Sequence, residues 1–230
     1  AWHGPLMMCG FFGVVISLER AVAVGRLWAY GAPLLTGLGT AVALLGGTGW
    51  APYLYLAGSG VMLLATLSVL QRQRENFVVV LAVAAACWPV GTALWAGGAG
   101  VHEVVLWWLG FLVLTIAGER LELSRFMPPS AAALRWFALI TALLLLALAG
   151  SLVALWQGAP AATWPVRGFG VGLLTLAGWL VRYDIARRTV RQSGLTRYIA
   201  LCLLSGYGWL ALGGGVMAVA GLQPGHPSYD

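Results

Sequence analysis

Residues 136–155 read WFALITALLLLALAGSLVAL and contain no charged residue. Because roughly 20 apolar residues of helix are needed to cross the hydrocarbon core of a bilayer, this stretch has the length and composition of a transmembrane helix. Backbone N–H and C=O groups find no water in hydrocarbon, so an apolar run of this kind satisfies them internally as a helix. The segment therefore predicts an α-helix that spans a membrane.

Similar apolar runs fill the rest of the chain. Of its 230 residues, 60% are hydrophobic and only 9% are charged, whereas a soluble domain carries roughly 25% charged residues. Glycine and proline separate the runs. The sequence shows no alternation of polar and apolar residues with period two, which argues against a β-barrel. We expect an all-α, polytopic transmembrane helix bundle that forms a single domain over residues 1–230. Its eight predicted spans lie near residues 4–20, 28–48, 52–70, 77–97, 104–123, 131–155, 164–183 and 198–221.

The basic residues provide a test of this helix count. The chain has thirteen arginines and no lysine. With eight spans, only Arg167 falls on one side of the membrane, and the positive-inside rule makes the other side cytoplasmic and both termini extracytoplasmic. The twelve arginines on the predicted cytoplasmic side are Arg20, Arg26, Arg72, Arg74, Arg120, Arg125, Arg135, Arg182, Arg187, Arg188, Arg191 and Arg197.

The net charge of +6 does not indicate a nucleic-acid partner. The arginines are spread through short loops between spans, and topology explains this distribution better than contact with phosphates does. The partners that we expect are the lipid bilayer and other membrane subunits, with no nucleic acid. Because the chain starts with Ala1 and stops soon after a span, we expect it to be a fragment of a longer chain.

Small residues are predicted to serve packing. The three cysteines, Cys9, Cys87 and Cys202, lie in separate apolar runs, and we interpret them as small buried hydrophobic residues. Glycines at close spacing let membrane helices approach one another. Two groups of glycines have this spacing: Gly168, Gly170 and Gly172, and Gly206, Gly208 and Gly213.

Most acidic residues lie beside arginines at the predicted cytoplasmic helix ends. Helical side chains meet at spacings of three and four residues. Two groups have this spacing: Glu122 with Arg125, and Asp184 with Arg187 and Arg188. We interpret them as interfacial ion pairs that anchor the spans. A proton path at the membrane edge is the alternative, and Glu119 and Glu122 are its candidates because they continue an apolar helix.

The chain has three histidines, His3, His102 and His226, and the topology places all three at the outer ends of spans. A neutral imidazole binds haem iron or copper without bringing a charge into lipid. A histidine at an interface also serves as a polar tip among headgroups, and both interpretations stay open. No two histidines have a spacing that forms a local copper or zinc site.

The opening of the chain resembles a known motif. Residues 2–13 read WHGPLMMCGFFG, which is similar to the His-Gly-x-x-Met start of the second helix of heme-copper oxidase catalytic subunits. In that family the helix runs from outside to inside, and its histidine is an axial ligand of the low-spin haem. The resemblance therefore implies that His3 is a metal ligand of haem b.

The whole chain resembles an uncharacterised bacterial membrane family associated with NnrS-type, nitric-oxide-response proteins. The resemblance rests on residues 19–22 (ERAV), 119–125 (ERLELSR) and 182–188 (RYDIARR). It places His102 near the position of a copper-binding histidine of the oxidases, displaced toward the interface. The oxidases' later histidine pair has no counterpart, so the resemblance implies no copper site assembled from this chain.

From this resemblance we expect an integral membrane haem-b-binding protein with His3 and His102 as cofactor-binding residues. It would serve electron transfer or nitric-oxide metabolism as a multi-pass protein of the bacterial cytoplasmic (inner) membrane. Whether it is an enzyme stays open, and the sequence assigns no catalytic residue. The alternatives are a non-catalytic scaffold or assembly subunit of a larger membrane complex, or a transporter.

Overall fold

The fold is known from a computed structural model that describes residues 2–126, 129–159 and 162–221. Throughout these ranges the regular structure is helical and contains no strand. Eight helical segments are long and apolar enough to cross a membrane, which confirms the predicted fold class. These segments are His3–Val24, Leu27–Leu44, Ala51–Arg72, Asn76–Ala96, Val101–Leu123, Ala131–Trp156, Thr163–Tyr183 and Gly194–Ala220.

The second span is shorter than the sequence predicts. Its helix ends at Leu44, although the predicted span continues to residue 48. Gly46 has a φ of +89°, a left-handed conformation that favours glycine and ends a helix. The chain then turns into the third span, which begins at Ala51 with a proline in its first turn.

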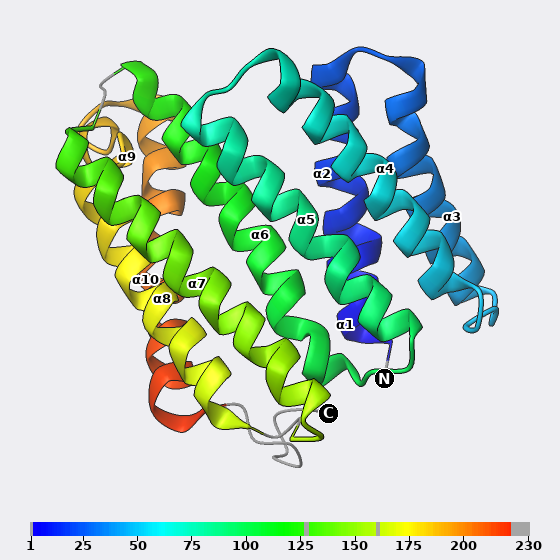
Figure 1. Ribbon diagram of the computed structural model, residues 1–230. Helices are drawn as coiled ribbons and strands as arrows, with labels where there is room; N and C mark the ends of the chain where they lie inside the picture. The colour runs from blue at the N-terminus through cyan, green and yellow to red at the C-terminus, as the bar shows by residue number, and fades with distance from the viewer. Residues whose placement is uncertain (1, 127–128, 160–161, 222–230) are drawn as a thin grey trace. The chain divides into compact units, whose positions relative to one another are not determined.

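The contacts divide the chain into two compact units, residues 1–118 and residues 119–229. In unit 1, α2 packs on α3 and α4, and α4 packs on α5, as Figure 1 shows. The elements of unit 1 are α1 (His3–Pro5), η1 (Leu6–Phe12), α2 (Gly13–Val24), η2 (Leu27–Tyr30), α3 (Gly31–Leu44), α4 (Ala51–Arg72), α5 (Asn76–Ala96) and most of α6 (Val101–Leu123).

The first span is continuous from α1 through η1 to α2, but η1 is a π-helix rather than an α-helix. Two glycines leave room for neighbouring helices to pack closely on this span. A Cβ atom on Gly10 would lie 2.9 Å from Oγ1 of Thr40, and one on Gly13 would lie 2.4 Å from the ring of Trp88. These positions therefore let α3 and α5 approach the widened helix.

Unit 2 contains η3 (Ser124–Phe126), α7 (Ala131–Trp156), α8 (Thr163–Tyr183), α9 (Ala186–Thr189) and α10 (Gly194–Ala220). α8 packs against both α7 and α10. Gly170 faces the backbone of α10, where a Cβ atom would lie 2.5 Å from the amide nitrogen of Ala218. Gly172 faces α7, where a Cβ atom would lie 2.5 Å from Leu144. Close packing on two sides of α8 thus depends on glycine.

The glycine prediction is confirmed for Gly170 and Gly172 and wrong for the second group. A Cβ atom on Gly206, Gly208 or Gly213 would meet no atom within 4 Å. These three residues lie on the exposed side of α10. The α10 glycine that does make a close approach is Gly214, which faces the backbone of α8 around Gly170.

The packing of α8 on α10 predicts that the same glycine-to-valine substitution lowers stability at one position and not at another. Gly170→Val forces a side chain against backbone atoms of α10, which cannot move away as a flexible side chain can. We expect the free energy of unfolding in detergent to fall by about 1–3 kcal/mol. Gly208→Val, made in open space on α10, controls for the helix propensity of valine. Equal losses in the two variants would contradict the packing described for α8.

Candidate functional site

His3 begins the first span, and its side chain is exposed. The same exposed side of the span continues with Met7 and Phe11, whose side chains are 39% and 56% exposed. These three residues follow one another at intervals of four, so they lie along one face of the helix. The imidazole therefore stands at the end of an apolar surface that the rest of unit 1 leaves uncovered.

His102 lies at the same end of unit 1 as His3. A Cβ atom on Gly4 would lie 3.4 Å from Val101, so the starts of the first span and of α6 are neighbours. Both imidazoles are exposed. His3 and His102 thus lie at the same end of unit 1, their placement on the outer side of a membrane stays a prediction, and His226 lies outside the described residues.

Glu103 serves the start of α6. Its carboxylate accepts a hydrogen bond from the backbone N–H of Gly100. This contact satisfies an N–H group before the helix, as the glutamate of a capping box does, and places a negative charge at the helix N-terminus. The acid beside His102 therefore has a structural role.

Four aromatic residues form a cluster in unit 1 beside the start of the first span. The ring of Trp95 is the centre of this cluster, and its neighbours come from three other segments of the chain. The ring centroids lie 5.3 Å from Trp2, 5.6 Å from Trp108 and 6.3 Å from Tyr55. Rings at such distances attract one another beyond their hydrophobic burial.

A buried polar network joins the first span to α5 and α6. The hydroxyl of Thr92 donates to the carbonyl oxygen of Trp88 at 2.9 Å and accepts from the indole N–H of Trp108 at 3.3 Å. The sulfur of Cys9 lies 3.9 Å from that hydroxyl and accepts from the indole N–H of Trp88 at 3.4 Å. Because the hydroxyl has a single hydrogen, the Cys9 thiol is the donor to Thr92.

The cysteine prediction is confirmed for two of the three residues. Cys9 and Cys87 are buried, whereas Cys202 is exposed on α10. Cys9 is more than a small hydrophobic residue, since it belongs to the network with Thr92 and Trp88. Sequence spacing could not show this contact, because the partners lie 79 and 83 residues apart.

The predicted ion pair between Glu122 and Arg125 is confirmed, with 2.8 Å between Oε1 and Nη2. Both side chains are partly exposed, at 39% for Glu122 and 52% for Arg125. A pair at such a surface contributes little stability, and anchoring a helix end at the interface is its simplest role. The proton path through Glu119 and Glu122 stays a prediction.

The helical spacing expected for Asp184 is wrong, because α8 ends at Tyr183 and Asp184 has an extended backbone. Asp184 is instead buried, with 6% of its surface exposed. One carboxylate oxygen accepts from the hydroxyl of Tyr207, and the other accepts from the backbone N–H of Ala186 at 3.2 Å. The contact with Tyr207 ties the end of α8 to the middle of α10.

Half-buried Arg120 lies near the contact of Asp184 with Tyr207 and forms a polar cluster with it in unit 2. It acts electrostatically on Tyr207, and its Nε atom is buried without a hydrogen-bond partner in the described part of the chain. A carboxylate away from water is tolerated only with charge and hydrogen-bond partners. No sequence spacing predicts this cluster, because its members come from α6, the residue after α8, and α10.

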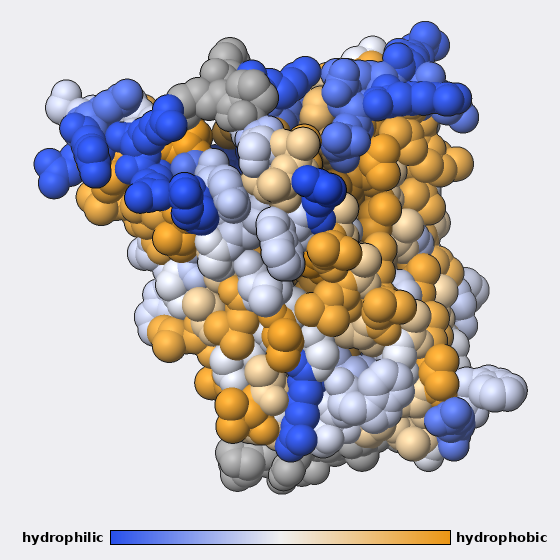
Figure 2. Space-filling view, turned by 60° about the vertical axis from the view of Figure 1, so that its left-hand side comes forward, coloured by the Kyte–Doolittle hydropathy of each residue, from blue (hydrophilic) through white to orange (hydrophobic). Residues whose placement is uncertain are grey.

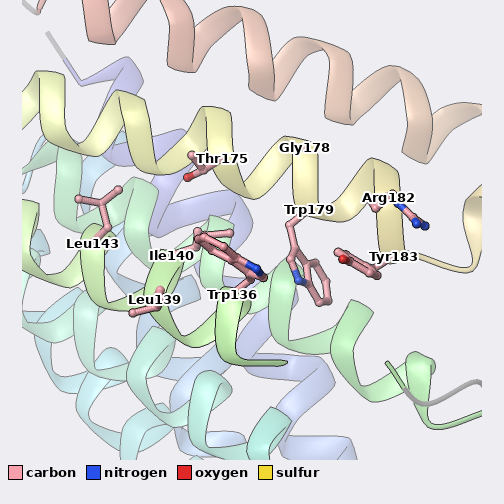
Figure 3. Close-up of a pocket in the computed structure, with 9 residues that line it drawn as sticks. All are labelled: Trp136, Leu139, Ile140, Leu143, Thr175, Gly178, Trp179, Arg182 and Tyr183. Carbon is pink, nitrogen blue, oxygen red and sulfur yellow. The ribbon is translucent and has the colours of Figure 1, made fainter. Parts of the chain in front are cut away.

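An apolar groove of about 430 Å³ lies between α7 and α8. Figure 3 shows the side chains that α7 and α8 direct into it. The indole N–H of Trp179 donates to the carbonyl oxygen of Ala133 at 2.9 Å, so this wall of the groove is fixed. The lining residues are Trp136, Leu139, Ile140, Leu143, Thr175, Gly178, Trp179, Arg182 and Tyr183.

A protein-family model described as "Domain of unknown function (DUF8744)" matches residues 1–230. No curated protein and no solved structure matches the chain.

The polar cluster predicts the effect of removing one hydroxyl. Tyr207→Phe leaves a buried Asp184 oxygen without its donor, so we expect the free energy of unfolding to fall by about 1–3 kcal/mol. Tyr198→Phe is the matched control, because Tyr198 lies on the same helix and is 65% exposed. We expect that control to change stability by less than about 0.5 kcal/mol. A Tyr207→Phe variant as stable as the control would refute the role of the cluster.

Proposed function

The chain belongs to the DUF8744 family, and on this premise we propose that it is an integral membrane protein that binds haem b through His3. Its role is in electron transfer or nitric-oxide metabolism. The observation that carries this proposal is the position of His3, an exposed imidazole at the start of an uncovered apolar helix face. The similarity of residues 2–13 to the oxidase motif supports it from the sequence.

The residues present fit the ligand requirements of a haem. A haem iron needs one or two axial ligands from protein, and a neutral histidine is a common one. The imidazole of His3 makes no hydrogen bond to another described residue, whereas its backbone carbonyl accepts from the N–H of Leu6, so both ring nitrogens are available to a ligand. A porphyrin also needs apolar contact to be shielded from water, and Met7 and Phe11 provide an apolar surface on the same face.

When bound, the haem supplies a reversible one-electron change at its iron, and the protein supplies the ligand and the surroundings. His3 would hold the iron, and Met7 and Phe11 would exclude water beside it. The second imidazole at this end of unit 1 belongs to His102, which would be the candidate for a second ligand of the iron among the described residues. His226 is the other histidine of the chain.

The proposal predicts the absorption of the purified protein. In detergent, the full chain reconstituted with haem b should show a Soret band and a low-spin spectrum. We expect His3→Ala to abolish haem retention, and His3→Met to retain haem with a raised reduction potential, because a thioether is a neutral ligand that raises the potential. Rescue by methionine separates ligation from a merely structural role of the imidazole.

Two further variants identify the second ligand. If His102 binds the iron, His102→Ala converts the spectrum from low-spin to high-spin while haem is retained through His3. If His226 binds it, His226→Ala has this effect instead. Retention of an unchanged spectrum in His3→Ala, or a wild-type protein that stays colourless with haem, would refute the proposed function.

A further inference from the structure

Unit 2 contains a cavity of about 490 Å³ that the haem proposal does not use. Four arginines line it: one at the end of α8, two on α9 and one just after α9. In Figure 2, where unit 2 comes forward, hydrophilic side chains gather at the end of the unit where α9 lies. The full lining is Pro129, Ser130, Arg182, Tyr183, Asp184, Arg187, Arg188 and Arg191. We call this space the basic cavity.

The charge of the basic cavity is positive. Asp184 is its one acidic lining residue, and both oxygens of that carboxylate already accept hydrogen bonds from Tyr207 and Ala186. The N-terminus of α7 adds to the positive potential, because Ser130 is the N-cap of this 26-residue helix. A cavity with this potential attracts an anion.

Four guanidinium groups in one cavity favour a phosphate as the bound anion. Arginine presents a planar set of donors that matches phosphate oxygens and binds them in pairs. A carboxylate has only two acceptor oxygens in one plane, whereas a phosphate presents oxygens in several directions and can engage more arginines at once. The basic cavity therefore has the chemistry of a phosphate-binding site.

The basic cavity adjoins the apolar groove between α7 and α8, since Arg182 and Tyr183 line both. The Arg182 guanidinium lies 5.3 Å from the centroid of the Tyr183 ring, a contact that helps to hold the side chain at this boundary. Each space has a volume within the range of ligand pockets, about 300–1,000 Å³. Together the two spaces offer groups that bind phosphate at one end and the apolar groove at the other.

We propose that these two spaces form a binding site for an anionic phospholipid. The headgroup phosphate lies in the basic cavity, and an acyl chain lies in the apolar groove against Trp136, Leu139 and Leu143. The groove distinguishes this ligand from a free phosphate, which would have no use for it. Basic pockets at helix ends on the cytoplasmic side bind anionic headgroups in membrane proteins, and the arginine-rich side is the predicted cytoplasmic one.

Native mass spectrometry of the full chain, purified in detergent with added lipids, tests the headgroup part. We expect retention of one phosphatidylglycerol and little retention of zwitterionic phosphatidylcholine. The double variant Arg187→Gln, Arg191→Gln should retain about tenfold less phosphatidylglycerol. The matched control is Arg72→Gln, Arg74→Gln, which removes the same charge from arginines on the same predicted side that do not line the cavity. That control should retain the lipid as the wild type does.

A second pair of variants tests the acyl-chain part. Gly178 lines the groove, and a Cβ atom there would meet no atom within 4 Å. Gly178→Leu therefore fills the groove without disturbing the packing, and we expect it to reduce phosphatidylglycerol retention. Gly206→Leu, made at an exposed glycine of α10 that also faces open space, is the control and should have no effect.

Inorganic phosphate as a competitor distinguishes a lipid from a soluble anion. The proposal predicts that millimolar phosphate displaces the lipid only partly. Complete displacement by phosphate, with no effect of Gly178→Leu, would show a soluble-phosphate site and overturn the proposal. Equal losses in the two arginine pairs, or equal wild-type retention of phosphatidylglycerol and phosphatidylcholine, would show non-specific attraction and overturn it as well.

Discussion

Every feature of this protein depends on the cost of leaving polar groups in hydrocarbon. Backbone groups avoid this cost within helices, and arginine side chains avoid it at helix ends, where the positive-inside rule predicts the orientation of the spans from their charge. The same constraint places the polar side chains that could bind ligands at the ends of the helices. Guanidinium groups line a cavity at the end of unit 2, and the exposed imidazoles of His3 and His102 lie together at one end of unit 1. The two proposed ligand sites are therefore built from different residues in different units.

The described spans bury few polar side chains, and two sets of them join helices through hydrogen bonds. Thr92 and Cys9 join three helical segments of unit 1, while Asp184 and Tyr207 join α8 to α10 in unit 2. Small residues make these contacts reachable, because Gly13 accommodates the ring of Trp88 and Gly170 accommodates the backbone of α10. Packing in lipid gains little from the hydrophobic effect, so close approach and hydrogen bonding between helices decide how the spans associate.

The sequence was sufficient to predict the number and type of the spans, because apolar length and composition determine both. It overextended the second span to residue 48, although the helix ends at Leu44 and the chain turns at Gly46. It also identified the exposed His3 as a candidate ligand and the pair of Glu122 with Arg125. The contact of Asp184 with Tyr207, the π-helix after His3 and the groove beside Trp179 could not be predicted, because each depends on how separate helices pack and no spacing along the chain encodes that.

Labelling of single cysteines tests the central claim, that arginine placement sorts the helix ends into two compartments. Positions 74 and 99 flank α5 (Asn76–Ala96), and each can carry one cysteine in a chain whose native cysteines are replaced by alanine. A membrane-impermeant maleimide added to intact cells should label Ala99→Cys at once and Arg74→Cys only after the membrane is permeabilised. Labelling of both positions from the same side would contradict the helix count, the orientation and the assignment of His3 to the outer face.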